Sequence, residues 1–147
     1  MRTLQTVALI AATMTMGSMA GIFAVYAHTV MPGLGRTDDR TFVGAFQAMD
    51  RAILNVWFMA GAFGGALVFT ATAAALLLAG DGHGVLAWVV VALALYLVVV
   101  VITMAVNVPL NNAIKAAGDP DRIEDLAAVR QRPKFSQLAG QYGRMAK

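Results

Sequence analysis

The sequence has no cysteine, few histidines and few charges, and each shortage excludes a class of function. Disulfide bonds and thiolate chemistry are excluded because none of the 147 residues is cysteine. Only two histidines are present, which argues against a dedicated transition-metal site. Charged residues make up 13% of the chain, and its net charge is +3. The positively charged residues lie next to the apolar runs. That pattern indicates contact with membrane lipid and no nucleic-acid partner.

Three long stretches contain no charged residue. They run from Thr3 to Gly35, from Ala52 to Gly80 and from Gly82 to Ala113, with His83 counted as neutral. Each is longer than the roughly 20 residues that cross a hydrocarbon core. The mean hydropathy is +0.70, and the stretches lack the polar face that helices of soluble proteins show. The sequence therefore predicts an all-α integral membrane protein, a helical bundle with three transmembrane helices.

We expect one membrane domain over residues 1–147, with spans at about 4–28, 52–79 and 85–112 and a polar, amphipathic tail at 118–147. In the tail, four apolar residues share a helical face that suits a membrane surface or a partner helix: Phe135, Leu138, Tyr142 and Met145. A signal peptide ending near Ala20 is the alternative for the first span. The apolar run continues to Val30, which favours an uncleaved span.

Small residues recur at helical spacing in the first two spans. Gly17 and Gly21 form one four-residue pair, and Gly61 and Gly65 form another. Such pairs allow helices to approach closely, so we expect tight packing and surfaces for a homo-oligomer. In the first span the small-residue stripe continues to His28, which predicts that this side chain points toward a partner helix.

Two breaks in the apolar pattern predict further local structure. Thr37 or Asp38 is expected to cap a short interfacial helix, which either ends before the second span or runs straight into it. Pro109 frees the carbonyl of Ala105, so we expect a kink at that point of the third span. The helix is then predicted to end with Gly118 as its left-handed terminal residue.

The distribution of basic residues predicts the topology. Arg2 is the one lysine or arginine on the side of the N-terminus and the 80–84 turn. The other side carries ten, namely Arg36, Arg40, Arg51, Lys115, Arg122, Arg130, Arg132, Lys134, Arg144 and Lys147. By the positive-inside rule, the chain is expected to be a multi-pass protein of the cell (plasma) membrane with a cytoplasmic C-terminal tail.

Polar side chains converge on the cytoplasmic ends of the predicted spans. Gln47, Arg51 and Asn55 share one helical face, and His28 lies at the same end. The third span ends in a polar cluster around Pro109, consisting of Asn107, Asn111 and Asn112. Polar residues near membrane depth are costly unless they face the bundle interior or a wet cavity. This convergence marks the candidate site, with Asp50 beside Arg51 interpreted as an interface anchor.

Three short motifs carry a resemblance to a known family. They are His28-Thr-Val-Met-Pro32-Gly-Leu34, then Phe46-Gln47-Ala-Met49 with Asn55, then Asn107-Val-Pro109-Leu-Asn111-Asn112. The chain resembles, over roughly residues 5–117, a family of small bacterial membrane proteins of unknown function that includes the fungal anthrone oxygenases. The resemblance implies a four-helix membrane bundle. The resemblance implies a fourth apolar span after about Arg130. At that place this sequence has a polar segment instead, RQRPKFSQLAGQYGRMAK.

The resemblance also implies a function, cofactor-independent oxidation of an anthrone, or of a hydrophobic polycyclic phenol, by O₂. In this interpretation His28 is the general base, because imidazole exchanges protons near neutral pH. Asn107 and Asn111 complete the catalytic set as donors to the enolate oxygen. Gln47, Arg51, Asn55 and Asn112 are candidate substrate-binding residues. The alternative is that His28 caps a helix end and that the asparagines join helices.

Two other function classes remain open from the sequence. The first is a non-enzymatic membrane protein, either a structural or accessory subunit or a binder of lipid or quinone. It predicts that the polar residues pair with one another, whereas an oxygenase predicts that they line a cavity for a flat aromatic. The second is a small multidrug-type transporter. It ranks last because proton-coupled export needs an ionisable residue at membrane depth, and the predicted spans contain no Asp, Glu, Lys or Arg.

Overall fold

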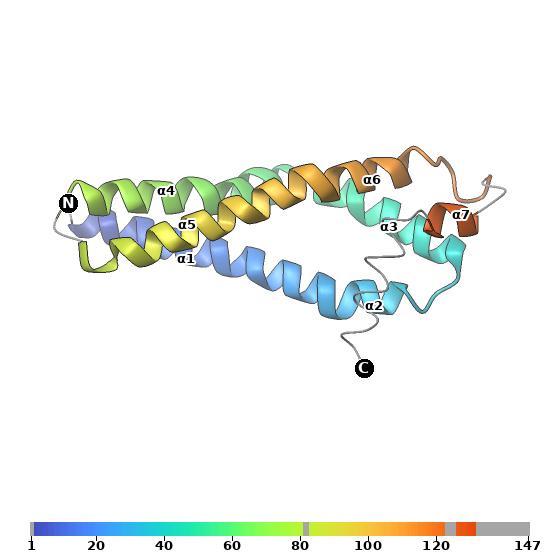
Figure 1. The fold of residues 1–147 in the computed structure, drawn as a ribbon, viewed down its shortest axis with the longest axis horizontal. Coiled ribbons are helices and arrows are strands. Elements are labelled where there is room, and N and C mark those ends of the chain that lie inside the picture. Colours follow the sequence, from blue (N-terminus) through green and yellow to red (C-terminus); the bar gives the residue numbers. More distant parts are fainter. Residues whose placement is uncertain (1, 81–82, 123–125, 132–147) are drawn as a thin grey trace. The chain divides into compact units, whose positions relative to one another are not determined.

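The protein is an all-α membrane protein with three helices long and apolar enough to cross a membrane (Figure 1). The computed structural model describes residues 2–80, 83–122 and 126–131. The three long helices are Arg2–Leu34, Trp57–Leu78 and His83–Lys115. The third is the most apolar, and only 6% of its most apolar window is buried. A helix that is apolar on all sides and mostly uncovered is suited to lipid contact.

Both of the longest helices contain a wide π-helical turn next to a proline. In the first, α1 (Arg2–Val25) leads through η1 (Tyr26–Val30) into α2 (Met31–Leu34), which contains Pro32. In the third, α5 (His83–Ile102) leads through η3 (Thr103–Asn107) into α6 (Val108–Lys115), which contains Pro109. Proline has no N–H to donate to the preceding turn, and a π turn accommodates that missing bond. The helix therefore continues past each proline, and past Pro32 it reaches Leu34.

The end of the third helix has the predicted geometry. Gly118 has φ of 89°, a left-handed conformation that a glycine adopts without a steric cost. Its position after Lys115 confirms it as the residue that stops the helix. The short α7 (Leu126–Gln131) follows. The predicted amphipathic helix of the tail lies outside the described residues, as does any fourth helix after residue 131.

The predicted interfacial helix is α3 (Asp39–Ile53). Asp38 is its N-cap, and its carboxylate accepts hydrogen bonds from the backbone N–H of Thr41 at 3.0 Å and from the Thr41 hydroxyl at 2.6 Å. Leu54 leaves the helical conformation with ψ of 40°, so α3 ends there and does not run into the second span. The next helical segment is η2 (Trp57–Gly64), which continues into α4 (Gly65–Leu78).

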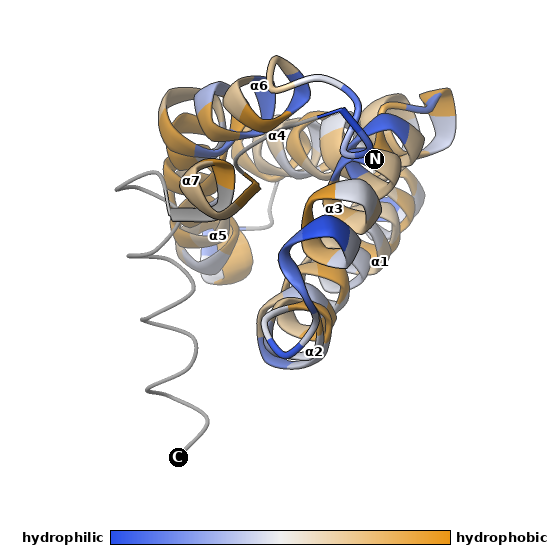
Figure 2. Ribbon diagram, turned by 90° about the vertical axis from the view of Figure 1, so that its right-hand side faces the viewer, coloured by the Kyte–Doolittle hydropathy of each residue, from blue (hydrophilic) through white to orange (hydrophobic). Residues whose placement is uncertain are grey.

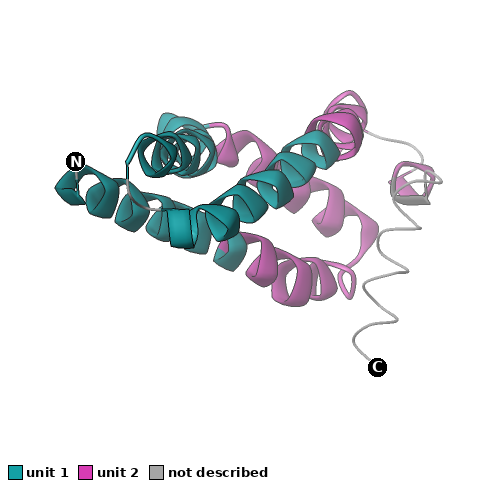
Figure 3. Ribbon diagram, turned by 60° about the vertical axis from the view of Figure 1, so that its left-hand side comes forward, with its two compact units in different colours: residues 1–21, 55–103 teal, residues 22–54, 104–147 magenta. Residues whose placement is uncertain are grey.

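The residues divide into two compact units, which are described separately (Figure 3). Unit 1 comprises residues 1–21 and 55–103, and unit 2 comprises residues 22–54 and 104–147. In unit 1, α4 packs against α5, and the Tyr96 hydroxyl donates to the Phe63 carbonyl at 2.8 Å. The Gln5 side chain of α1 donates to the Leu76 carbonyl at 2.8 Å.

The small residues of α4 pack as expected only in part. Gly65 and Ala66 are buried, and a Cβ on Gly65 would lie 3.5 Å from the Thr15 methyl of α1. At Gly17, Gly21 and Gly61, however, an added Cβ would meet no atom within 4 Å. The expected close approach of another helix of the described chain is therefore wrong at these three glycines, while the homo-oligomer surfaces stay a prediction. The buried residues of α1 lie on another face, at Ala8, Ala12 and Met19.

Candidate functional site

Unit 2 contains an apolar cluster that brings α3 against α6. Phe42, Val43 and Phe46 are buried at helical spacing on α3, and Leu110 and Ile114 are buried one turn apart on α6. Residues of α2 and α7 complete the cluster, namely Met31 and Val129. Because the two helices meet through these side chains, the polar residues next in register on each helix also meet. Figure 2 shows the contrast between the hydrophilic stretches of α3 and the hydrophobic long helices.

Asp50 is the centre of a polar network between the two helices. It lies one turn after Phe46 on α3, and its side chain is only 6% exposed. The Asn111 amide nitrogen donates a hydrogen bond to Oδ1 of Asp50. The Lys115 ammonium lies 2.9 Å from Oδ2 of Asp50. Asn111 and Lys115 are four residues apart on α6, so both reach the same carboxylate from neighbouring turns.

Gln47 holds the end of the same helix. Its side-chain nitrogen donates to the carbonyl of Ile114 at 3.0 Å and to the carbonyl of Gly118 at 2.9 Å. The last carbonyls of a helix lack partners within the helix, and a buried carbonyl without a donor is costly. Gln47 is buried at 3% exposure and supplies both donors. It therefore acts as a side-chain cap for the end of the third span.

The structure brings together only some of the predicted site residues. Asn111 bonds to Asp50, and Gln47 caps the end of the same helix through the carbonyls of Ile114 and Gly118. Asn107 is half-buried one turn before Asn111, and no described residue bonds to its side chain. Arg51 and Asn112 are exposed and make no side-chain bond within the described part of the chain.

Asn55 belongs to unit 1 and has a structural role. Its side-chain oxygen accepts a hydrogen bond from the backbone N–H of Phe58 at 2.9 Å. This bond satisfies one of the unpaired N–H groups at the start of the second span. The predicted face shared by Gln47, Arg51 and Asn55 is therefore interrupted, because the chain leaves the helix at Leu54.

The prediction that His28 points toward a partner helix is wrong. His28 lies in the π turn η1, and its side chain is exposed. The other residues of the stripe, from Thr13 through Gly17 and Gly21 to Ala24, are exposed as well. The stripe exists, but the buried face of this helix follows Ala8, Ala12 and Met19 instead. Small residues identify a face that permits close approach and do not require that another helix lie on it.

Sequence reasoning missed the two charged members of the network. Asp50 was interpreted as an interface anchor, although its spacing from Phe46 and Gln47 places it on the buried face of α3. Lys115 lies one turn after Asn111, and this spacing was the available signal. Among the residues that the structure describes, no group of three or more His, Cys, Asp or Glu side chains suits a metal ion.

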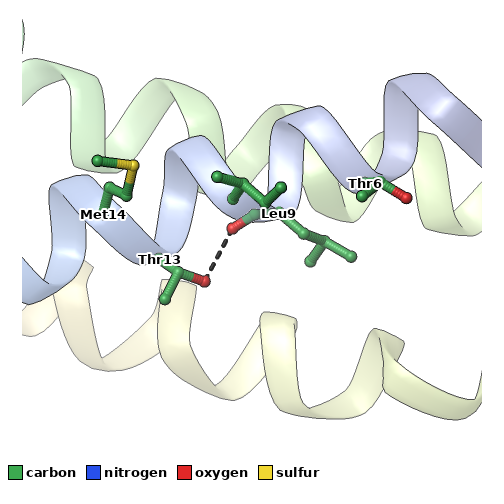
Figure 4. A pocket seen from close by; sticks show the side chains of 5 residues that line it. Thr6, Leu9, Thr13 and Met14 are labelled. Carbon is green, nitrogen blue, oxygen red and sulfur yellow. Dashed lines mark hydrogen bonds between the residues drawn. The ribbon is translucent and has the colours of Figure 1, made fainter.

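A shallow groove on α1 has an apolar lining and is not a candidate catalytic site. Its lining consists of Thr6, Leu9, Ile10, Thr13 and Met14 (Figure 4). The Thr13 hydroxyl donates to the Leu9 carbonyl at 2.8 Å, and the Thr6 hydroxyl donates to the Arg2 carbonyl at 3.0 Å. Hydroxyls bonded to their own helix leave an apolar surface. This groove suits contact with lipid chains.

Comparison with known proteins decides the family. The family model described as anthrone oxygenase matches residues 54–140, which is more than half of the chain. The chain belongs to the anthrone oxygenase family. No curated protein and no solved structure matched it.

The matched region divides the polar network of this anthrone oxygenase family member. It contains Asn107, the last residue of η3, and the α6 side chains Asn111 and Lys115. Gln47 and Asp50 precede it on α3. The family match thus covers α6, which carries Asn111 and Lys115. The local contacts of unit 2 identify α3 as the helix whose Asp50 binds these two side chains.

Proposed function

We propose that this protein is a membrane-embedded oxygenase that converts a hydrophobic anthrone, or a related polycyclic phenol, to a quinone with O₂. Family membership is the observation that supports the reaction class. The overall change is balanced when one anthrone and one O₂ give one anthraquinone and one water. One oxygen atom enters the ring carbonyl and the other leaves as water.

The reaction can proceed without a cofactor because the substrate itself becomes the reductant. Removal of a proton from the CH₂ of the central anthrone ring, which lies opposite the carbonyl, gives an enolate that is electron-rich enough to react with O₂. The protein must then supply a base, a donor to the enolate oxygen and an apolar surface. His28 is our candidate base, and its exposure at the end of an apolar helix makes it accessible to a substrate dissolved in the bilayer.

The asparagines of the third helix are the candidate donors. Asn107 is half-buried and its carboxamide has no partner among the described residues, so it is available to a ligand. Asn111 uses one N–H on Asp50 and keeps its carbonyl oxygen for another partner. Arg51 and Asn112 are exposed in unit 2 and remain candidates for substrate contact. Gln47 is excluded from our substrate-binding set because it caps the helix end.

The location of the reaction follows from the charge distribution. Ten of the eleven basic residues belong to the 36–51 connection and the segment from Lys115 onward. We infer a plasma-membrane protein whose C-terminal tail faces the cytoplasm, which places unit 2 at the cytoplasmic side.

A non-enzymatic role is the second candidate, and one observation favours it. Gln47, Asp50 and Asn111 bond within the protein, as expected if the polar cluster only joins helices. The proposed enzyme also needs His28 and Asn107. The side chains of these two residues make no hydrogen bond to another described residue.

The test is oxidation of an anthrone by the full chain reconstituted in lipid nanodiscs. Quinone formation in air should exceed the spontaneous rate in protein-free nanodiscs. His28→Ala and Asn107→Ala should each lower the excess rate, whereas the matched control His83→Ala, in the other unit, should not. A rate equal to the background for the wild type would favour the non-enzymatic role.

A further inference from the structure

The third helix presents three half-buried polar side chains on successive turns. They are Asn107, Asn111 and Lys115, and each is separated from the next by four residues. At 1.5 Å per residue the row is about 12 Å long. This length is comparable with the long axis of a flat three-ring aromatic. The row begins where the apolar part of the helix ends.

Each member of the row has hydrogen-bonding capacity that the described residues leave unused. The Lys115 side chain is 31% exposed, and its ammonium makes one ion pair, with Asp50. An ammonium has three N–H donors, so the others are free for a ligand. Asn107 has both its donors and its acceptor available, and Asn111 has its carbonyl oxygen. The partner Asp50 is buried and fixes the direction from which Lys115 reaches the row.

We propose that this row binds a hydroxylated three-ring aromatic lengthwise, with the Lys115 ammonium donating to an acidic ring oxygen at one end. The identity of the ligand rests on the proposed function, whereas the site itself does not. The proposal adds Lys115 as a binding residue and makes Asp50 its positioning residue. It also defines the ligand class as one with polar substituents at both ends of the ring system.

Electrostatics favour Lys115 over three described cations of unit 2, namely Arg40, Arg51 and Arg122. Arg40 pairs with Asp121, and Arg122 lies 3.8 Å from Asp119, all four side chains being largely exposed. Arg51 is exposed on α3. Exposed charges are screened by water and salt, but a half-buried ammonium acts on a ligand oxygen in a medium of lower dielectric. The Asp50 carboxylate opposes this effect in part, so a binding oxygen gains less than it would from an unpaired lysine.

The experiment uses a hydroxyanthraquinone, whose colour changes when its hydroxyl ionises and which needs no turnover. Its apparent pKa is measured in zwitterionic nanodiscs with and without the full-length protein. The wild type should lower it, by less than the roughly one to three units that an unpaired opposite charge at contact distance gives, because Asp50 opposes the lysine in part. Lys115→Met should abolish the shift and Lys115→Arg should retain it. Arg122→Met, which removes an exposed cation of the same unit, should leave the shift unchanged.

The variants separate the possible failures. The double variant Asp50→Asn with Lys115→Met removes both charges and leaves no buried carboxylate unpaired. It can therefore be measured if the single variant Lys115→Met unfolds. It should also abolish the pKa shift. An unchanged shift in that double variant overturns the proposal, and means that the lysine meets lipid phosphates or water. No shift in the wild type overturns it too, even if anthrone is oxidised. A shift without turnover supports the binding row and contradicts the oxygenase.

Discussion

The ion pair between Asp50 and Lys115 should respond very differently to loss of either partner. Lys115→Met leaves the Asp50 carboxylate in a site where its side chain is 6% exposed. Removing one partner of a buried pair costs about 3–5 kcal/mol, so we expect about 3 kcal/mol for this change. Asp50→Asn leaves a lysine that is 31% exposed and can extend to water, and the new amide can still accept from Asn111. We expect about 1 kcal/mol for that change.

The assay is unfolding in mixed micelles, followed by the loss of helical circular dichroism as the fraction of denaturing detergent rises. The double variant Asp50→Asn with Lys115→Met should be more stable than Lys115→Met alone, because no buried charge is left without a partner. Equal losses in the two single variants would refute this reasoning. A double variant whose loss equals the sum of the single losses would show that the two side chains are not coupled.

Three further changes test separate parts of the structure. Gln47→Leu removes the side-chain donor to the carbonyl of Gly118 and one of the two donors to the carbonyl of Ile114, which also accepts from the Ala117 N–H, so it should cost about 1–3 kcal/mol in the same assay and speed amide exchange at the end of the third span. Thr70 is buried and its hydroxyl has no hydrogen-bond partner among the described residues, so Thr70→Val should be neutral or stabilising in thermal unfolding, and a clear loss would reveal a missed partner. Hydrogen bonds from the hydroxyl and then the backbone N–H of Thr41 hold the pKa of Asp38 below its ordinary value of 3.8. The cap should therefore be fully formed above that value and be lost as the pH falls through the lower folded pKa, and Asp38→Asn should remove this acid-dependent change in the Thr41 amide signal.

Local rules predicted the helices and their ends because the relevant signals lie within a few residues of each other. Charge-free runs identified the three long helices. An aspartate before α3 and a glycine after α6 have chemistry that acts within one turn, and both are found in the predicted roles, at Asp38 and Gly118. Pro109 was predicted to kink its helix, and in the structure it follows a π turn through which the helix continues.

The site was harder to predict because it depends on which faces meet. The stripe ending at His28 is regular in the sequence, yet nothing local determines that Ala8, Ala12 and Met19 form the buried face instead. The Asp50–Lys115 pair joins residues far apart in the chain, and the sequence suggested only an interface anchor at Asp50 and Arg51. Helical periodicity places residues on a face, whereas tertiary packing decides what the face contacts.

The most direct test of the account is oxidation of an anthrone under ¹⁸O₂ by the full chain in lipid nanodiscs, with protein-free nanodiscs as background. We expect quinone formation faster than background, one labelled oxygen per quinone formed, and loss of the excess rate in His28→Ala. A wild-type rate equal to background, or an excess of quinone that carries no label, would contradict it.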